Sequence, residues 1–259
     1  IEYRREVSND FMYSIIIKPN KLWTSLQVIF LIRFWISRIL YPSLYLYPSG
    51  IKKIDKIIAH ENLLILRRLC NEAGLNFILF YGTLLGAVRE HDFITHDEDI
   101  DVVMYKADMA KFLNLLFELR KEGFELARYE RRGFLSIIRK GEYIDVYFYE
   151  PYPQDSDLWY CCQDICKKEY VLDLISYKFR GNDYLIPRNY IGYLNYYFGT
   201  NWRTPIQFLN FNKSILAKIK EYTIQYIKAA LPPAITEWRQ RKTDAPKLKH
   251  WLKKIYEEK

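Results

Sequence analysis

Four acidic residues crowd into five positions just before an apolar segment, and this pattern constrains the fold more than any other. They are Asp97, Glu98, Asp99 and Asp101, and Val102-Val103-Met104 follows directly. If DIDVVMY forms a strand, Asp99 and Asp101 point to the same face, because side chains alternate along a strand. Two carboxylates held so close raise each other's pKa unless a cation lies between them. Hard oxygen ligands at this spacing suit Mg²⁺ or Mn²⁺, so the pair predicts a metal site.

A third acid lies inside a later apolar stretch. In GEYIDVYFYE, Asp145 is the only acid between Ile144 and Phe148, and a lone buried acid needs a partner. If this stretch is a strand beside DIDVVMY, Asp145 joins Asp99 and Asp101 in a cluster able to hold two metal ions. The alternatives are a solvated acidic turn for Asp99 and Asp101, and a structural ion pair with Arg or Lys for Asp145.

A turn from strand to helix is predicted upstream, at Gly82-Thr83. The apolar run NFILFYG ends at Gly82, and a short helix is predicted from Thr83 to Arg89. A small residue followed by a hydroxyl at such a turn exposes N–H groups and a side-chain donor to a phosphate. Gly82 and Thr83 are therefore candidates for binding phosphate, and a plain helix-start glycine is the alternative.

The succession of helical and strand-like stretches predicts an α+β fold. Helical spacing runs from Ser49 to a stop at Gly74 and again over 106–122, and strand-like runs cover 76–82, 99–105, 124–129, 134–139 and 143–149. Beyond Pro151 strand signals thin out and Tyr-rich helical stretches are predicted. The predicted parts are an N-terminal apolar and basic segment (1–48), a catalytic core (49–150) and a helical C-terminal region with a basic tail (151–259).

The stretch 22–48 is the most apolar part of the chain. Arg33 and Arg38 lie inside it and Pro42 breaks it, so a membrane-spanning helix is disfavoured. An interfacial helix that contacts a membrane peripherally and an ordinary packed helix both fit. The C-terminal APKLKHWLKKIYEEK is predicted to form a basic helix, either solvated or touching an anionic membrane.

The net charge of +8 and a pI of about 9.1 favour anionic partners. No nucleic-acid motif accompanies the charge, so nucleic acid is not expected as a partner. The four cysteines do not resemble a secreted disulfide framework. They predict buried free thiols and a cytoplasmic location, including the inner face of the plasma membrane, and no fourth zinc ligand is evident near Cys161, Cys162 and Cys166.

The segment Tyr81–Tyr105 resembles the signature of the LicD family, which includes fukutin and fukutin-related protein. That signature is Gly-Gly-Thr/Ser-Leu-Leu-Gly-Ala-x-Arg, followed by Phe/Ile-Ile-Pro-Trp-Asp-Asp-Asp-Ile-Asp. YIDVYFY around Asp145 is similar to the family's third acidic strand, and 179–205 is similar to its ending. This chain departs from the pattern at Tyr81, where the family often has Gly, and at Thr95-His96, where it has Pro-Trp. The first block matches at Gly82, Thr83, Leu84, Leu85, Gly86, Ala87, Arg89, Phe93, Ile94, Asp97, Asp99, Ile100 and Asp101.

The resemblance implies a nucleotidyltransferase-like fold of the DNA polymerase beta superfamily, with a mixed sheet and flanking helices. It also implies transfer of phosphocholine, ribitol phosphate or glycerol phosphate from a CDP-linked donor. The implied acceptor is a hydroxyl of a cell-surface glycan or of a lipid-linked oligosaccharide.

Roles for individual residues follow from a two-metal mechanism at this site. Asp145 is the predicted general base, and Asp97 is a further ligand or catalytic candidate. Arg89 is predicted to neutralise a diphosphate held at Gly82 and Thr83. Two other functions stay open: a nucleotidyltransferase that adds a nucleotide to a small molecule or RNA, and a non-catalytic binding module of the same fold. The expected ligands of Mg²⁺ or Mn²⁺ are Asp99, Asp101 and Asp145.

Overall fold

The computed structural model describes residues 52–206, 213–230 and 233–257. These residues belong to one compact unit, Leu46–Lys259. The apolar stretch 22–48, with its predicted interfacial or packed helix, lies outside the described residues. Within the described ranges, no helix is both long enough and apolar enough to cross a membrane.

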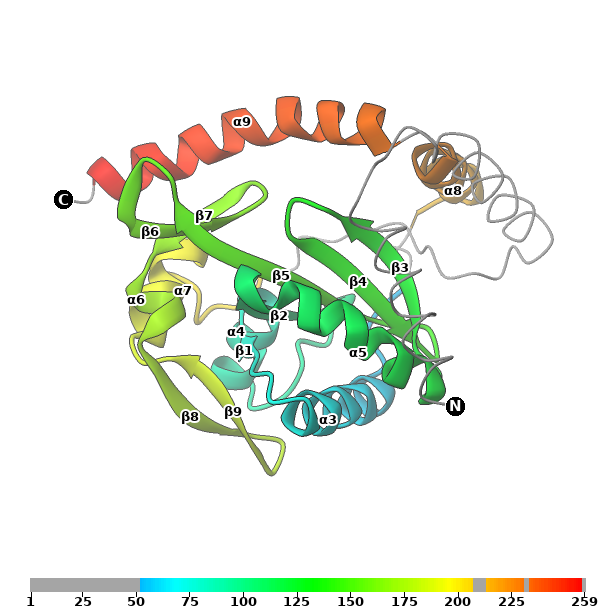
Figure 1. Ribbon diagram of the computed structural model, residues 1–259, viewed down its shortest axis with the longest axis horizontal. Helices are drawn as coiled ribbons and strands as arrows, with labels where there is room; N and C mark the ends of the chain where they lie inside the picture. Colours follow the sequence, from blue (N-terminus) through cyan, green and yellow to red (C-terminus); the bar gives the residue numbers. More distant parts are fainter. Residues whose placement is uncertain (1–51, 207–212, 231–232, 258–259) are drawn as a thin grey trace. The chain divides into compact units, whose positions relative to one another are not determined.

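One mixed sheet carries the fold (Figure 1). Its main path runs β3-β4-β5-β2-β1-β9-β8, and β6 joins through β5 and pairs with β7. The neighbours β2 and β5 are parallel, as are β1 and β9, and the other pairs are antiparallel. The strands are β1 (Ile78–Leu79), β2 (Asp99–Tyr105), β3 (Glu125–Glu130), β4 (Phe134–Arg139), β5 (Glu142–Tyr152), β6 (Asp155–Cys161), β7 (Asp164–Lys167), β8 (Leu174–Phe179) and β9 (Asn182–Pro187).

Helices surround this sheet and make up the C-terminal part of the chain. Asp55 caps the first of them by accepting hydrogen bonds from the N–H groups of Ile57 and Ile58. The helices are α3 (Lys56–Glu72), α4 (Tyr81–Arg89), α5 (Met109–Lys121), α6 (Glu169–Leu172), α7 (Tyr190–Phe198), α8 (Ile215–Ala230) and α9 (Pro233–Glu257), with a 3₁₀ turn η1 at Lys106–Asp108.

The two faces of the sheet have different partners. On one face α3 and α5 cover the central strands, and the ring of Phe112 on α5 lies 5.7 Å from that of Phe148 on β5. Because side chains alternate along a strand, Asp145 and Tyr147 point to the opposite face. There the ring of Tyr147 lies 4.8 Å from that of Tyr81 on α4. The face opposite α3 and α5 therefore holds the acids.

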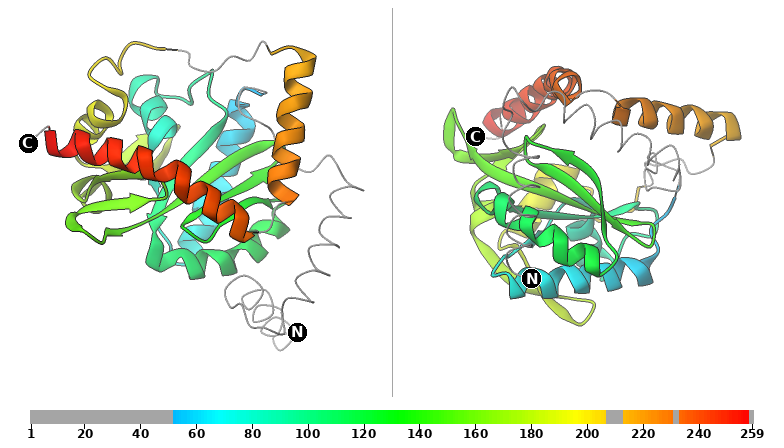
Figure 2. Two further views of the ribbon diagram at one scale, coloured as in Figure 1. Left: turned by 90° about the horizontal axis from the view of Figure 1, so that it is seen from above. Right: turned by 45° about the vertical axis from the view of Figure 1, so that its right-hand side comes forward.

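Helix α9 packs beside β6 and β7 (Figure 2). The ring of Trp251 stacks on that of Tyr197 of α7, with centroids 5.2 Å apart, and Ile255 is buried at 1% exposure. Lys247 donates a hydrogen bond to Gln163, and Arg132 forms an ion pair with Asp244. The predicted basic helix is thus present. It is not wholly solvated, because one side of it packs on the domain.

Two sequence expectations about the elements are wrong in detail. Strands do not end near Pro151, because β6, β7, β8 and β9 all follow it and the helical part begins at α7. These strands mix Tyr, Cys and charged residues, so they show little of the apolar alternation that marks a half-buried strand. In addition, α4 begins at Tyr81 and not at Thr83, since β1 is only two residues long.

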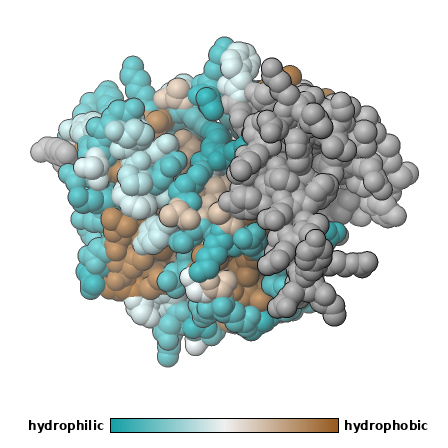
Figure 3. Space-filling model, in the orientation of Figure 1, coloured by the Kyte–Doolittle hydropathy of each residue, from teal (hydrophilic) through white to brown (hydrophobic). Residues whose placement is uncertain are grey.

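Polar side chains cover much of the face drawn in Figure 3, and apolar side chains gather in patches in its lower half. Patches of moderate size are normal on a folded domain, because there is too little polar surface to cover it. The large, fully buried side chains lie instead on both sides of the sheet, and include Phe80, Phe112, Phe148 and Tyr193.

Candidate functional site

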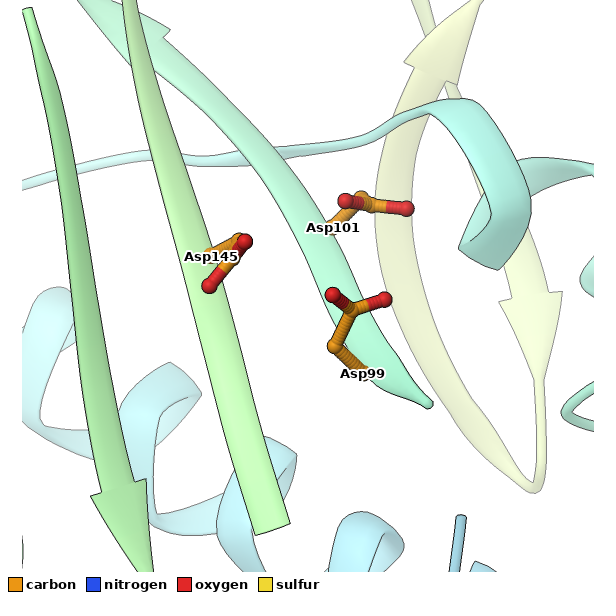
Figure 4. Close-up of side chains that lie close together, drawn as sticks. All are labelled: Asp99, Asp101 and Asp145. Atoms are coloured by element: carbon orange, nitrogen blue, oxygen red, sulfur yellow. The ribbon is translucent and has the colours of Figure 1, made fainter. Parts of the chain in front are cut away.

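Three carboxylates converge at the centre of the sheet. Asp99 and Asp101 lie on β2, Asp145 lies on the adjacent parallel strand β5, and Asp101 is directly opposite Asp145 in the register. One oxygen of each acid lies within 4.8 Å of the others (Figure 4). Asp101 and Asp145 are only 8% and 4% exposed. The predicted convergence is confirmed, and metal binding by this acid trio stays a prediction.

Burial and mutual repulsion make the ionised acid trio unfavourable. Burial raises the pKa of Asp99 well above its usual value, and the charge of Asp145 raises it further. Burial, followed by the charge of Asp99, does the same to the pKa of Asp101. A divalent cation offsets both effects, because it replaces lost hydration and screens the charges. The oxygen donors, their spacing and their surplus negative charge fit Mg²⁺ or Mn²⁺.

The start of α4 holds Asp101 in place. The backbone N–H of Gly82 donates to Oδ2 of Asp101 at 3.2 Å, and Thr83 Oγ1 accepts from the backbone N–H of Asp101 at 2.8 Å. Thr83 is 2% exposed. Because α4 starts two residues earlier than expected, the Thr83 hydroxyl lies under β2 and not in the open turn. Thr83 therefore anchors strand β2 through Asp101. Because its side chain is buried here, Thr83 is not placed to contact a phosphate directly, contrary to the sequence prediction.

Gly82 is required by the acids that press against it. A Cβ at this position would lie 2.5 Å from Oδ2 of Asp97 and 3.3 Å from Oδ2 of Asp101. Burial raises the pKa of Asp97 to about 6, so this fourth acid can bind and release a proton near neutral pH. The predicted position of Asp97 beside the acid trio is therefore consistent with the structure, and its role stays a prediction.

Tyr81 has a backbone conformation that favours glycine. Its φ is +45°, in the left-handed region, which gives a physical reason for the Gly in the family signature at this point. The Tyr81 side chain is 6% exposed, and its hydroxyl lies 2.6 Å from that of Tyr149. The side chains of Tyr81 and Trp251 both hydrogen-bond to the carboxylate of Asp164. Burial raises the pKa of Asp164 to about 6. Sequence analysis did not identify Asp164, because nothing in its local pattern sets it apart.

Arg89 is the last residue of α4, and its side chain bonds to partners at that end of the helix. It lies seven residues after Gly82 on α4, about 10 Å further along the helix axis at 1.5 Å per residue. Its Nη1 donates to the carbonyl of Trp202 at 3.0 Å and its Nη2 pairs with Glu90 at 2.7 Å. Its side chain is 9% exposed. Arg89 therefore ties α4 to the 199–204 turn, and the predicted diphosphate contact stays a prediction.

Arg128 and Ser136 are site residues that sequence analysis missed. Nη2 of Arg128 lies 3.1 Å from both carboxylate oxygens of Asp145, and the Ser136 hydroxyl donates to Asp145 Oδ1 at 2.5 Å. The ion pair that was the alternative for Asp145 is thus present together with the carboxylate cluster. The sequence signal for Arg128 is weak, since ELARYE reads as an exposed strand.

Two arginines of the C-terminal half have partners of their own. Arg188 pairs with Asp173, and the guanidinium of Arg203 stacks on the ring of Trp202 at 4.2 Å. The four cysteines are free thiols, as predicted. Among the described residues, the group of side chains placed to share a metal ion is the acid trio.

The sequence comparisons point to one family. Residues 74–189 match the family model described as LicD/FKTN/FKRP, nucleotidyltransferase domain. Over 58 residues the chain is 34% identical to the lipopolysaccharide cholinephosphotransferase LicD of Haemophilus influenzae. This stretch covers 22% of the chain and 22% of that relative. These matches confirm the resemblance predicted from sequence, and the mixed sheet with its helices confirms the α+β fold class; the nucleotidyltransferase likeness is the one in the description of the matching model.

Two solved structures are similar at low identity. The lincosamide antibiotic adenylyltransferase LnuA, with lincomycin bound, has a TM-score of 0.41 at 9% identity, covering 63% of this chain and 95% of that one. The antibiotic-resistance factor ANT(2'')-Ia in solution has a TM-score of 0.42 at 10% identity, covering 79% and 100%.

Proposed function

We propose that this chain, whose residues 74–189 match the LicD/FKTN/FKRP nucleotidyltransferase domain, is a metal-dependent phosphotransferase. It moves a phospho-alcohol group of the phosphocholine, ribitol phosphate or glycerol phosphate type from a CDP-linked donor to a hydroxyl of a glycan. The acceptor is a cell-surface glycan or its lipid-linked precursor. The observation that carries the proposal is the acid trio, whose oxygens lie within 4.8 Å of one another inside the matched domain.

The acid trio is the proposed site for Mg²⁺ or Mn²⁺. Asp99, Asp101 and Asp145 supply only oxygen ligands, which these hard cations prefer. When bound, a divalent cation lowers the pKa of the acceptor hydroxyl and stabilises the charge on the departing CMP phosphate. The hydrogen bonds from Gly82 and to Thr83 fix the position of Asp101 before any ligand arrives. Such preorganisation lowers the cost of binding in the productive geometry.

Two acids can accept the proton of the attacking hydroxyl. Asp145 was the sequence prediction, but it already accepts hydrogen bonds from Arg128 and Ser136, which weaken it as a base. Asp97 lies beside Gly82 and has a pKa of about 6, near the range in which a general base works well. We therefore assign the base role to Asp97 and metal ligation to Asp145.

The products of the reaction test this function. The purified chain is incubated with Mg²⁺ or Mn²⁺ and with CDP-choline, CDP-ribitol, CDP-glycerol or CTP, with and without bacterial lipopolysaccharide or teichoic acid. The proposal predicts release of CMP from a CDP-linked donor, accelerated by an acceptor and abolished by EDTA. Asp101→Ala that still folds should lose nearly all of this turnover.

Other products decide against the proposal. If CTP releases pyrophosphate and a nucleotide is added to the acceptor, the chain is a nucleotidyltransferase. This alternative is considered because the description of the matching family model contains that term. Binding of donor without any product indicates a non-catalytic module.

A further inference from the structure

We propose that Arg128 is a built-in counter-cation of the acid trio, which turns to the diphosphate of the donor when a metal ion binds Asp145. This inference rests on the proposed function and adds a residue to its site. It starts from a row of polar side chains that crosses four neighbouring strands. Arg128 is opposite Ser136, Ser136 is opposite Asp145, and Asp145 is opposite Asp101.

A β-bulge brings Arg128 into this row. Between Leu126 and Arg128 the register of β3 shifts against β4, so that Leu126 pairs with Ile137 and Arg128 pairs with Ser136. The extra residue is Ala127, which is 7% exposed. Bulges often re-aim a side chain next to an active site. Here the bulge places Arg128 opposite Ser136, so that its side chain lies on the same face of the sheet as Asp145.

Arg128 is held by aromatic rings as well as by charge. Its guanidinium carbon lies 5.4 Å from the ring centroids of both Phe134 and Tyr143, within cation–π range. Both contacts with Asp145 come from the single nitrogen Nη2. The Arg128 side chain is 41% exposed, whereas that of Asp145 is 5% exposed. The Arg128 side chain as a whole is thus partly exposed, whereas the carboxylate that it contacts is buried.

Charge balance makes the contact with Asp145 exchangeable. One guanidinium cannot neutralise three carboxylates, so the acid trio keeps surplus negative charge that attracts a divalent cation. A metal ion that takes the oxygens of Asp145 competes with Nη2 for them. The rings of Phe134 and Tyr143 keep Arg128 beside the site after this exchange. A guanidinium binds phosphate oxygens through paired N–H donors, and the diphosphate of a CDP-linked donor must come close to the acid trio.

The competing role for Arg128 is a purely structural ion pair that holds β3 to β5. The two roles predict opposite changes in metal affinity when Arg128 is replaced. A structural pair predicts that loss of Arg128 loosens the acid trio and weakens the binding of every ligand. The proposed exchange predicts that metal binding tightens, because a competing cation is removed, while binding of the donor diphosphate weakens.

The test is a titration of the full chain and of Arg128→Gln, first with Mn²⁺ alone and then with CDP at saturating Mn²⁺, by calorimetry. We expect Arg128→Gln to bind Mn²⁺ about three- to tenfold more tightly, as removal of a nearby positive charge implies. We expect it to bind CDP about ten- to a hundredfold more weakly, the range for losing a charge-assisted contact. Arg128→Lys should restore Mn²⁺ affinity to near the wild-type value and CDP affinity only in part.

Arg120→Gln is the matched control, since Arg120 lies on α5 at the other face of the sheet and its side chain is 73% exposed. It should leave both affinities unchanged. If the wild type binds both ligands and Arg128→Gln weakens both or changes neither, the inference is overturned and the proposed function stands. If the wild type binds no Mn²⁺, both the inference and the proposed function are overturned. Missing turnover with the expected binding pattern overturns the proposed function alone.

Discussion

Replacement of Asp99 by Asn should stabilise the metal-free protein. Among the described residues the Asp99 side chain makes no hydrogen bond, so the substitution removes a charge without breaking a contact. Its charge is destabilised by burial, then by Asp145 and Asp97. Asn resembles the neutral acid in shape. The free energy of unfolding without metal should therefore rise.

The separation of the acids sets the size of this effect. Two unit charges 4.8 Å apart repel by about 3.5 kcal/mol at an effective dielectric constant of 20. Part of this repulsion is already relieved, because a raised pKa leaves some of the acid trio protonated near neutral pH. We expect Asp99→Asn to raise the free energy of unfolding by about 1–3 kcal/mol at pH 8 in EDTA, a range that follows from this Coulomb energy.

Urea unfolding in EDTA and in Mn²⁺ measures the effect. Mn²⁺ at a hundred times its dissociation constant should stabilise the wild type by about 2.7 kcal/mol and stabilise Asp99→Asn much less, so the advantage of Asp99→Asn should shrink by most of that amount. Asp183→Asn, at an exposed position on β9, is the control for loss of one negative charge and should match the wild type in both buffers. A loss of stability for Asp99→Asn in EDTA, or equal stabilisation of both proteins by Mn²⁺, refutes the reasoning.

Three further predictions concern residues around the acid trio. Gly82→Ala should weaken Mn²⁺ binding by at least tenfold at a cost in stability of about 1 kcal/mol, because its Cβ would press on the carboxylates of Asp97 and of the proposed ligand Asp101; unchanged Mn²⁺ affinity by calorimetry contradicts this. Thr83→Val should lower the free energy of unfolding by about 1–3 kcal/mol, since it leaves the buried N–H of Asp101 without an acceptor; in urea unfolding Thr83→Ser should retain most of the stability, and equal losses would argue against the contact. Burial raises the folded-state pKa of Asp164 from 3.8 to about 6, so ionising this acid costs more in the folded protein than in the unfolded chain. As the pH rises from about 4 to about 7, the free energy of unfolding of the metal-free wild type should therefore fall by about 3 kcal/mol relative to that of Asp164→Asn. Parallel stability curves of these two proteins against pH would show that burial of Asp164 has no such effect.

The acid trio could be predicted from sequence because local patterns determine it. Strand alternation places Asp99 and Asp101 on one face, and an acid inside an apolar strand, Asp145, needs a partner. The structure adds only the register that brings the two strands together. Strand β2 has the predicted bounds, and β4 does as well.

The contacts of the site depend on longer-range geometry and could not be predicted. Arg128 reaches Asp145 through a bulge and two strand pairings, and none of these leaves a mark in a short window of sequence. Arg89 is a candidate by its place in a motif, and that place did not reveal its contacts with Trp202 and Glu90. Asp164 is surrounded by Tyr81 of α4 and Trp251 of α9, which are distant from it in sequence.

Crystals grown with Mn²⁺ and measured at a wavelength where manganese scatters anomalously show whether the acid trio binds a metal ion. We expect an anomalous peak bonded to oxygens of Asp99, Asp101 and Asp145, at about 2.1 Å as for small octahedral cations. Well-ordered crystals that show no peak at these three acids under saturating Mn²⁺ would contradict it.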